Sequence, residues 1–284
     1  MVWINTYQTM SNKHLPQCSL IISTYNWPEA LKSCVERIFA QTHLPQEILI
    51  ADDGSGSRTR ETIEQLSRVS PVPLHHIWHA DDGFRLSEIR NKAIAQAKYP
   101  YIIQIDGDIC AESHFIEDHL KMSKPGTFLC GSRVLLSEKL SKRIVHDPNY
   151  TWNRLQLPLG YLLNSLRIPI LGRFLAARYK RNQLTALRGC NMSFWRADLI
   201  KVNGYNNAIT GWGSEDAELV IRLHNLGCIK HFLKFMGIAY HIYHPENDKS
   251  RLSRNQEVQE RALAEKITYI TNGIYPERNQ KTHE

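Results

Sequence analysis

The chain has 284 residues, of which 42% are hydrophobic and 22% charged. This length and composition are typical of a globular protein with a large core, and they exclude a fibre, a repeat array and a mainly disordered chain. The formal net charge of +7 arises in one segment, because residues 133–188 hold 11 Lys or Arg against 2 Asp or Glu.

The first 110 residues alternate short apolar runs with helical periodicity, which predicts a mostly parallel β-sheet flanked by helices. Strands are predicted at 19–23, 47–51, 74–78 and 101–105. Helices are predicted from Pro28, over about 58–68 and after Ser87. Ligands of such sheets bind beyond the carboxyl ends of the strands, so we expect a site at that edge.

The α/β pattern resumes after the basic segment. A strand is predicted at 189–193, a helix from Glu215 to a stop at Gly227, and a further strand over 231–240. Residues 251–271 have the pattern of a polar helix, and the last dozen residues that of a tail.

Polar residues follow three of the predicted strands, at 23–26, 52–55 and 106–108. Carboxylates gathered at one sheet edge repel each other unless a cation neutralises them, which points to a divalent metal. Asp106 and Asp108, at i and i+2, are expected on one side of an extended segment, where a pair of carboxylates suits Mg²⁺ or Mn²⁺. The alternative is that these acids only form turns and cap the following helices.

Two adjacent acids, Glu215 and Asp216, follow the glycine-rich stretch 211–213 and open a predicted helix. Acids at this position are favoured by the helix dipole and need no function. The alternative is that one carboxylate removes a proton from a substrate hydroxyl while the other bonds a neighbouring group. Trp212 would then pack on a sugar face.

His241 and His244 end the last predicted strand. Residues at i and i+3 point to opposite faces of a strand, so both can bind one ion only if the chain turns between them. We therefore favour His244 as a metal ligand and keep His241 as a weaker candidate. Imidazole beside carboxylate favours Mn²⁺ over Mg²⁺. The alternative is a pair of half-buried structural histidines.

Six motifs in order resemble known glycosyltransferases. S-L-I-I-S-T-Y-N, A-D-D-G-S, D-D-G-F-R-L-S-E-I-R-N-K-A and Q-I-D-G-D resemble the nucleotide-sugar half of family 2 glycosyltransferases. G-C-N-M-S-F and G-W-G-S-E-D-A-E-L, followed by H-I-Y-H-P, resemble the C-terminal half of chondroitin-polymerase-type enzymes and β-1,4-galactosyltransferases. The likeness covers residues 18–132 and 186–246.

The resemblance implies a GT-A fold in a single domain and an inverting, metal-dependent transfer from a nucleoside diphosphate sugar, usually a UDP-sugar. It implies donor contacts at Thr24, Tyr25, Asn26, Asp52, Asp53, Arg85, Arg90, Asn91, Asp106, Gly107 and Asp108. It implies acceptor contacts at Asn191, Trp212, Gly213 and Glu215, a general base at Asp216, and metal ligands at Asp108, His244 and, less strongly, His241. The expected reaction moves a hexose or N-acetylhexosamine to a hydroxyl of a bacterial surface glycan: lipopolysaccharide, capsule or a lipid-linked oligosaccharide.

The same resemblance predicts five parts of the chain: an N-terminal extension (1–17), a nucleotide-sugar half (18–132), a basic and apolar insertion (133–185), an acceptor half (186–250) and a C-terminal helix and tail (251–284). The insertion matches neither half. Its interleaved Leu, Ile, Arg and Lys suit an anionic membrane interface, where it could meet a lipid-linked acceptor. Alternatively, its apolar residues pack on the core while its Arg residues face water.

Six single cysteines and the lack of an apolar signal core in the first seventeen residues predict a cytoplasmic protein, with peripheral attachment to the inner face of the membrane as an option. The arginines and prolines of 157–177 argue against a membrane span. No nucleic-acid module is recognisable, and the oligomeric state is left open. Two rival functions remain: an inactive glycosyltransferase-like glycan-binding module and a sugar nucleotidyltransferase.

Overall fold

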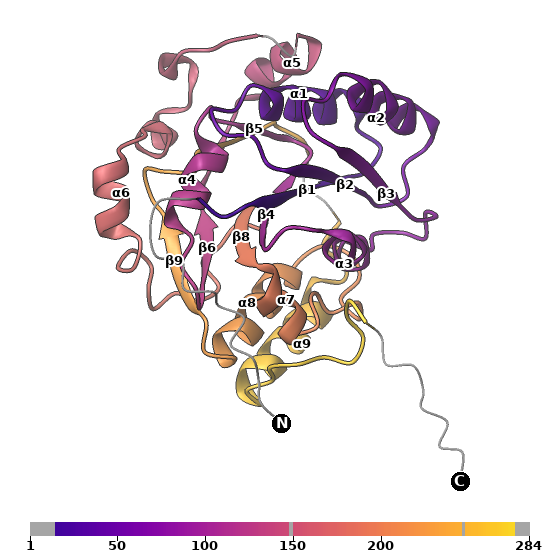
Figure 1. Ribbon diagram of the computed structural model, residues 1–284, viewed down its shortest axis with the longest axis vertical. Helices are drawn as coiled ribbons and strands as arrows, with labels where there is room; N and C mark the ends of the chain where they lie inside the picture. Colours follow the sequence, from indigo (N-terminus) through magenta and orange to yellow (C-terminus); the bar gives the residue numbers. More distant parts are fainter. Residues whose placement is uncertain (1–14, 148–149, 246–247, 276–284) are drawn as a thin grey trace.

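The computed structural model describes residues 15–147, 150–245 and 248–275. The predicted N-terminal extension and C-terminal tail lie mostly outside these ranges. The described residues form an α/β fold around a large, mostly parallel sheet, as predicted (Figure 1). Its strands lie in the order β3 (Leu74–Trp78), β2 (Glu47–Asp52), β1 (Cys18–Thr24), β4 (Tyr101–Asp106), β8 (Asn191–Trp195), β6 (Thr127–Gly131) and β9 (Ile229–Leu233).

Helices cover both faces of this sheet because each presents an apolar stripe to it. The helices α1 (Pro28–Phe39), α2 (Ser57–Val69) and α4 (Phe115–Met122) pack on one face, through Leu31, Ile63 and Phe115 among others. The helices α3 (Leu86–Gln96), α7 (Arg196–Lys201) and α8 (Glu215–Asn225) pack on the other. Figure 1 shows α1 and α2 on the opposite side of the sheet from α3, α7 and α8. The helix α9 (Leu252–Ala264) packs on α8.

Only β8 runs against its neighbours, being antiparallel to both β4 and β6. The carboxyl ends of β1, β2, β4, β6 and β9 therefore all lie at one edge of the sheet, together with the start of β8. A smaller sheet continues from this edge, in the order β5 (Ile109–Ala111), β10 (Ala239–His241) and β7 (Arg133–Leu135). This edge is where the predicted site residues should meet.

Two predicted elements differ from the structure. The single strand expected over 231–240 is two strands, β9 and β10, because the chain turns between them through left-handed backbone at Phe235 and Gly237. The helix expected over 251–271 ends at Ala264, shortly before Lys266 takes a left-handed conformation. In both cases a local turn interrupts a segment whose apolar pattern is continuous.

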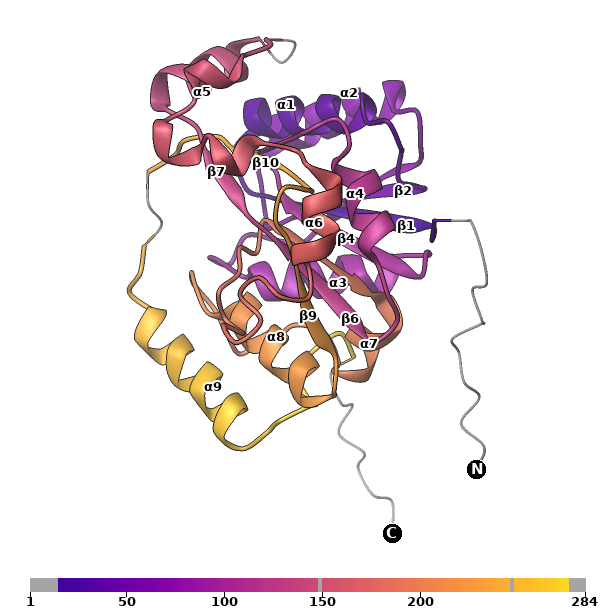
Figure 2. The same ribbon diagram turned by 90° about the vertical axis from the view of Figure 1, so that its left-hand side faces the viewer.

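The insertion runs along the β9 edge of the large sheet, on the side of the molecule that Figure 2 presents to the viewer. It contains α5 (Glu138–His146), three short 3₁₀ turns (Arg154–Gln156, Leu159–Tyr161 and Leu163–Ser165) and α6 (Pro169–Leu175). The first residues of the insertion form β7, which pairs with β10 in the smaller sheet. Across the described ranges, no helix combines the length and apolar character needed to cross a membrane.

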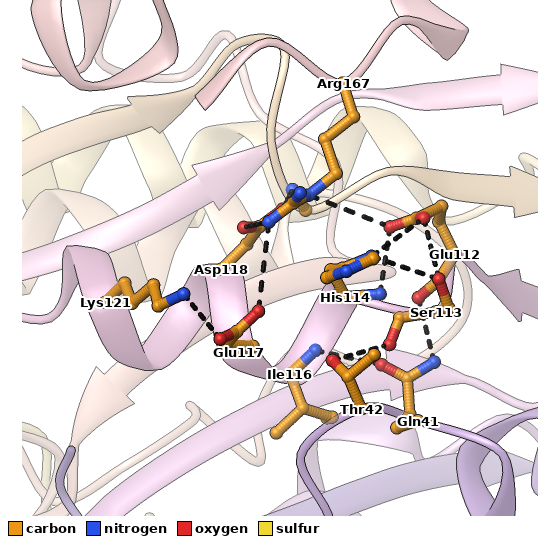
Figure 3. A network of polar contacts seen from close by, with 11 residues as sticks. Gln41, Thr42, Glu112, Ser113, His114, Ile116, Glu117, Asp118, Lys121 and Arg167 are labelled. Carbon is orange, nitrogen blue, oxygen red and sulfur yellow. Dashed lines mark hydrogen bonds and ion pairs between the residues drawn. The ribbon is translucent and has the colours of Figure 1, made fainter. Parts of the chain in front are cut away.

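A buried ion pair anchors the insertion to the core (Figure 3). The Asp118 side chain on α4 is fully buried, and it accepts two hydrogen bonds from the Arg167 guanidinium, at 2.9 and 2.6 Å. Asp118 also accepts one from the backbone N–H of Gly237, at 3.0 Å. Glu112 and Glu117 lie within 4.0 Å of the same guanidinium. These contacts raise the pKa of Arg167, chiefly through the hydrogen bonds to Asp118.

Candidate active site

The structure gathers the predicted site at the carboxyl edge of the large sheet. Strand register places Ser23 beside Asp106, Thr24 beside Asp52, and Ile105 beside Asn191. The helix α8, which begins with Glu215 and Asp216, approaches the same edge, because Asp216 is hydrogen bonded to groups of α3 and β4. Residues far apart in the sequence therefore line one site.

The strongest candidate for a metal centre is the triad Asp108, His241 and His244. Ligand atoms of these three residues lie within 4.8 Å of one another. The Asp108 Oδ2 atom is 3.4 Å from His241 Nε2 and 3.3 Å from His244 Nε2. Strand β10 ends at His241, and the irregular segment that follows places His244 beside the same carboxylate. The predicted weaker ligand, His241, is thus as close to Asp108 as the favoured one.

The hydrogen bonds around the triad suit metal binding. The Nδ1 atoms of His241 and His244 lie 2.8 and 2.6 Å from the carbonyl oxygens of Ile242 and Pro245. When each Nδ1–H donates to its carbonyl, each Nε2 lone pair faces Asp108, and this is the arrangement that metal-bound histidines use. The Asp108 Oδ1 atom is buried without a hydrogen-bond partner among the described residues. These observations fit a divalent cation.

Burial lowers the pKa of His241, which favours the neutral, ligand form of this imidazole. The pKa of His244 is raised, mainly by its hydrogen bond to Asp108. The two histidines therefore differ in environment although they face one carboxylate.

Asp106 and Asp108 have different partners, contrary to the expected extended pair. Asp106 ends β4, and Gly107 and Asp108 form a turn before β5. The Asp106 carboxylate accepts a hydrogen bond from Arg90 at 2.9 Å, whereas Asp108 faces the histidines. Burial raises the pKa of Asp106 to about 6, even though Arg90 opposes that rise.

Arg90 links the two halves of the site. This arginine of α3 is only 1% exposed, and its guanidinium bonds Asp106 at 2.9 Å, Asp216 Oδ1 at 3.1 Å and Ser23 Oγ at 3.1 Å. Its charge is held between two carboxylates, which raise its pKa against the effect of burial. Arg90 therefore fixes the position of the predicted base relative to the predicted donor site.

Asp216 has one anchored oxygen and one available oxygen. Oδ1 accepts hydrogen bonds from Arg90, from the Tyr205 hydroxyl at 2.9 Å and from Gln104 at 3.4 Å. Oδ2 has no partner among the residues that the structure describes and is not fully buried. Gly189 lies directly against Oδ2, since a Cβ at this position would overlap it. Among the described contacts, Oδ2 is therefore the oxygen of Asp216 that is left available for a further hydrogen bond.

Glu215 has a raised pKa. Burial, followed by the charge of Asp216, raises the pKa of Glu215 to about 7. Its Oε2 atom is buried without a partner in the described part of the chain. A carboxyl group with this pKa is partly protonated near neutral pH, so it can donate as well as accept a hydrogen bond. This suits a contact with a sugar hydroxyl.

The nucleotide side of the site contains predicted residues in two different situations. Tyr25 is half exposed, and its hydroxyl donates to Asp81 at 3.0 Å. Asp52 is fully buried and accepts from Ser55 N–H at 2.8 Å, while its other oxygen lies 2.8 Å from His76 Nε2. Asp52 therefore shapes the turn that carries its neighbour Asp53.

Asp53 is held by one side chain and one backbone group. Its oxygens lie 2.7 Å from His79 Nε2 and 2.9 Å from the Arg85 backbone N–H. The Arg85 guanidinium donates instead to the Ala80 carbonyl and to the Glu88 carboxylate. The Asn26 side chain caps the same turn by accepting from Gly56 N–H. Gly107 lies against Thr24, where a Cβ would approach to 3.2 Å of the hydroxyl.

The predicted acceptor side also divides into exposed and buried groups. Trp212 is 36% exposed and lies between Gly211 and Gly213, which both have left-handed backbone. Asn191 is fully buried, and its amide donates to the carbonyls of Ser132 and Gly237. Trp212 is thus presented to solvent, whereas Asn191 holds neighbouring backbone together.

Sequence patterns did not single out Tyr205 and Gln104, which bond Asp216, or His76 and His79, which bond Asp52 and Asp53. Asn91, predicted near the donor, is buried and bonds both backbone groups of Tyr205 at 2.7 and 2.8 Å. Arg90 bonds Asp216 directly, and Asn91 holds Tyr205, which bonds Asp216. The Arg90-Asn91 motif in the sequence therefore marks residues that position Asp216.

Comparisons with solved structures agree with this fold. TarS from S. aureus superposes with a TM-score of 0.59 at 14% identity, covering 88% of this chain and 41% of TarS. The mannosyltransferase PcManGT from Pyrobaculum calidifontis, in complex with GDP-Man and Mn²⁺, has a TM-score of 0.58 at 13% identity and covers 86% of this chain and 61% of its own. A TarS fragment, residues 1–349, in complex with UDP-GlcNAc has a TM-score of 0.59. The fold is GT-A.

Sequence comparisons identify relatives that include chondroitin synthases and a glucosyltransferase. Chondroitin synthase of Pasteurella multocida is 25% identical over 93% of this chain and 29% of its own length. Chondroitin synthase of Escherichia coli is 25% identical over 89% of this chain and 38% of its own. Validoxylamine A glucosyltransferase of Streptomyces hygroscopicus is 24% identical over 76% of this chain and half of its own. The chain thus spans less than two-fifths of either chondroitin synthase.

Family comparisons cover most of the chain, including the insertion. Residues 171–245 match the family described as N-terminal domain of galactosyltransferase. Residues 19–202 match the family described as glycosyl transferase family 2. The predicted resemblance is confirmed, and the chain belongs to glycosyl transferase family 2.

Proposed function

We propose that this enzyme is an inverting, metal-dependent glycosyltransferase that moves a hexose or N-acetylhexosamine from a UDP-sugar to a hydroxyl of a bacterial surface glycan, such as lipopolysaccharide, capsule or a lipid-linked oligosaccharide. The observation that carries the proposal is the bridge formed by Arg90 between Asp106 and Asp216. It joins a carboxylate of the predicted donor site to a carboxylate with an available oxygen.

In this proposal Asp108, His241 and His244 hold a divalent cation. Two imidazoles beside one carboxylate favour Mn²⁺ over Mg²⁺. When bound, the cation supplies positive charge that stabilises the leaving diphosphate. PcManGT binds Mn²⁺ in its own structure, which supports this choice.

Asp216 acts as the general base in the proposed reaction. Its Oδ2 atom takes the proton of the acceptor hydroxyl while the hydroxyl oxygen forms a bond to the anomeric carbon of the donor sugar. The bond between that carbon and the diphosphate oxygen breaks, and its electron pair leaves with UDP. Arg90, Tyr205 and Gln104 hold Oδ1 so that Oδ2 faces the acceptor. The single displacement inverts the anomeric centre and needs no covalent intermediate on the protein.

The other predicted residues bind the two substrates. Asp53 contacts the uracil or its ribose. Tyr25, which directly follows β1, is exposed to solvent on the nucleotide side of the site. Trp212 packs on a sugar face, and Glu215 bonds a hydroxyl of the acceptor or donor sugar. The UDP-GlcNAc complex of the TarS fragment supports a uridine nucleotide.

A donor and metal screen tests this function. Purified protein is mixed with UDP-sugars and GDP-mannose, with Mn²⁺ or with EDTA, and nucleotide release and thermal unfolding are measured with a panel of glycan acceptors. We expect UDP release and thermal stabilisation by one UDP-sugar in Mn²⁺ and neither in EDTA. Donor binding without transfer to any acceptor would favour an inactive binding module, and release of pyrophosphate a nucleotidyltransferase.

We also propose that the insertion binds the surface of an anionic membrane and so brings the enzyme to a lipid-linked acceptor. Leu155, Leu159 and Ile170 are between 83% and 89% exposed, and Phe174 is 59% exposed. Such exposure of several large apolar side chains in one segment favours a membrane over packing on the core. Basic residues of the same segment would each add about 1 kcal/mol near an anionic surface.

Substitution of two exposed side chains tests the membrane proposal. We expect the double variant Leu159→Gln, Ile170→Gln to bind vesicles of mixed phosphatidylglycerol and phosphatidylcholine at least about tenfold more weakly in a flotation assay, because each side chain loses apolar burial. The control, Val69→Gln with Leu263→Gln, removes exposed apolar residues elsewhere. Equal binding of both double variants would refute the proposal. The variants keep Arg167, because deleting the segment would leave buried Asp118 without its partner.

A further inference from the structure

A basic cavity lies at the same edge of the sheet as the active site, where β6 and β9 end and the insertion begins. Its volume is about 250 Å³. The polar side chains that line it include Arg133, Tyr161, Asn164, Lys180, Arg188 and Lys234. The lining residues include four cations and no carboxylate.

Among the described residues, the cations of this cavity have no carboxylate partner. The Arg133 side chain makes no hydrogen bond or ion pair within the described ranges. Lys234 donates to the Asn164 side chain, and Arg188 to the Leu187 carbonyl, so neither is paired with a charge. Burial and the charge of Lys180 both lower the pKa of Lys234. Like charges held together without compensation create a strong local attraction for anions.

Two backbone connections link the cavity with the predicted base and the metal triad. Arg188 immediately precedes Gly189, which lies against Asp216 Oδ2. Leu135, which also lines the cavity, pairs with His241 in the register of β7 and β10, and Arg133 begins the same strand β7. The positive charge of Arg133 acts on both metal-site histidines: it adds to the effect of burial that lowers the pKa of His241, and it opposes the rise in the pKa of His244 that the hydrogen bond to Asp108 causes. The cavity therefore adjoins the predicted base on one side and the metal triad on the other.

The position of the cavity separates it from the nucleotide site. Donor residues follow β1, β2 and β4, whereas the cavity lies at the ends of β6 and β9, on the far side of β8. A group bound there would approach Asp216 from the acceptor side.

We propose that this cavity binds an anionic group of the acceptor, a phosphate or a carboxylate, close to the hydroxyl that is glycosylated. Arginine binds either group through two parallel hydrogen bonds, and Arg133 and Arg188 are the main contacts. The inference rests on the proposed function, because it names the class of acceptor for the same active site.

Pyrophosphate binding in the presence of EDTA tests the cavity without the metal. We expect the 284-residue chain to bind pyrophosphate in isothermal titration calorimetry, and the variant Arg133→Gln, Arg188→Gln to bind at least about tenfold more weakly, since each arginine supplies a charge-assisted hydrogen bond. The control, Arg68→Gln with Lys139→Gln, removes the same charge from exposed positions outside the cavity and should bind as the wild type does. No binding by the wild type, or equal binding by the cavity variant, would overturn the proposal.

Paired acceptors identify the anion. Wild-type enzyme and the cavity variant are supplied with neutral sugars and with matched phosphate monoesters and uronic acids, and UDP release is measured. We expect the wild type to have a higher kcat/KM for one anionic class, and the cavity variant to lose this preference through a rise in acceptor KM with an unchanged donor KM. A wild-type preference for neutral sugars would refute the inference. A wild type that releases no UDP with any donor would instead refute the proposed function. The pyrophosphate titration would still decide whether the cavity binds an anion.

Discussion

The variant Asp216→Asn is expected to lower kcat by about 10²- to 10⁴-fold while donor binding is retained, because general base catalysis typically contributes this much. An asparagine oxygen can still accept the hydrogen bonds from Arg90 and Tyr205, so the local structure should persist. Its amide nitrogen would then occupy the place of Oδ2 and cannot take a proton from the acceptor. Single-turnover rates and thermal shift with UDP-sugar measure the two effects separately.

Glu215→Gln provides the comparison for this variant. Because the pKa of Glu215 is raised to about 7, glutamine resembles a form of this side chain that is already populated near neutral pH. We expect a smaller loss, seen mainly in the acceptor KM. If Asp216→Asn kept kcat within tenfold of the wild type, or if Glu215→Gln lost more than Asp216→Asn, the base would be misassigned.

The variant Asp108→Asn is expected to bind Mn²⁺ at least about 100-fold more weakly, and to lose Mn²⁺-dependent stabilisation by the donor. Replacement of groups that only support metal ligands already costs about 10–100-fold in affinity, so loss of the one carboxylate in the triad should cost no less. Titration of Mn²⁺ followed by electron paramagnetic resonance measures the affinity, and thermal unfolding with UDP-sugar measures the coupling to the donor.

Glu64→Gln, an exposed acid of α2, controls for the change in net charge and should bind Mn²⁺ as the wild type does. His241→Ala and His244→Ala separate the two histidines, and each should weaken binding if both are ligands. Wild-type affinity in Asp108→Asn would place the ion elsewhere and remove the basis for the proposed donor site.

The parts of the fold that were predictable are those with local signals. β1, β2 and β4 are continuous apolar runs, and α1 repeats Leu31, Val35 and Ile38 on one face, so periodicity alone predicts them. The gathering of the acids at the ends of β2 and β4 was also predictable, because the carboxyl ends of parallel strands lie at one edge of the sheet. The break between β9 and β10 was not, since the apolar pattern runs through Phe235 while the backbone turns there.

The amino-acid sequence alone determined the α/β class, the family resemblance, and Asp108, His244 and Asp216 as candidates, because motifs of neighbouring residues carry that information. Only the tertiary structure decided that Arg90 joins Asp106 to Asp216, that His241 faces the same carboxylate as His244, and that unpaired cations surround a cavity beside them. Arg90 and Asp216 are 126 residues apart. Contacts over such separations depend on the order of strands and on turns between them, which local patterns do not encode.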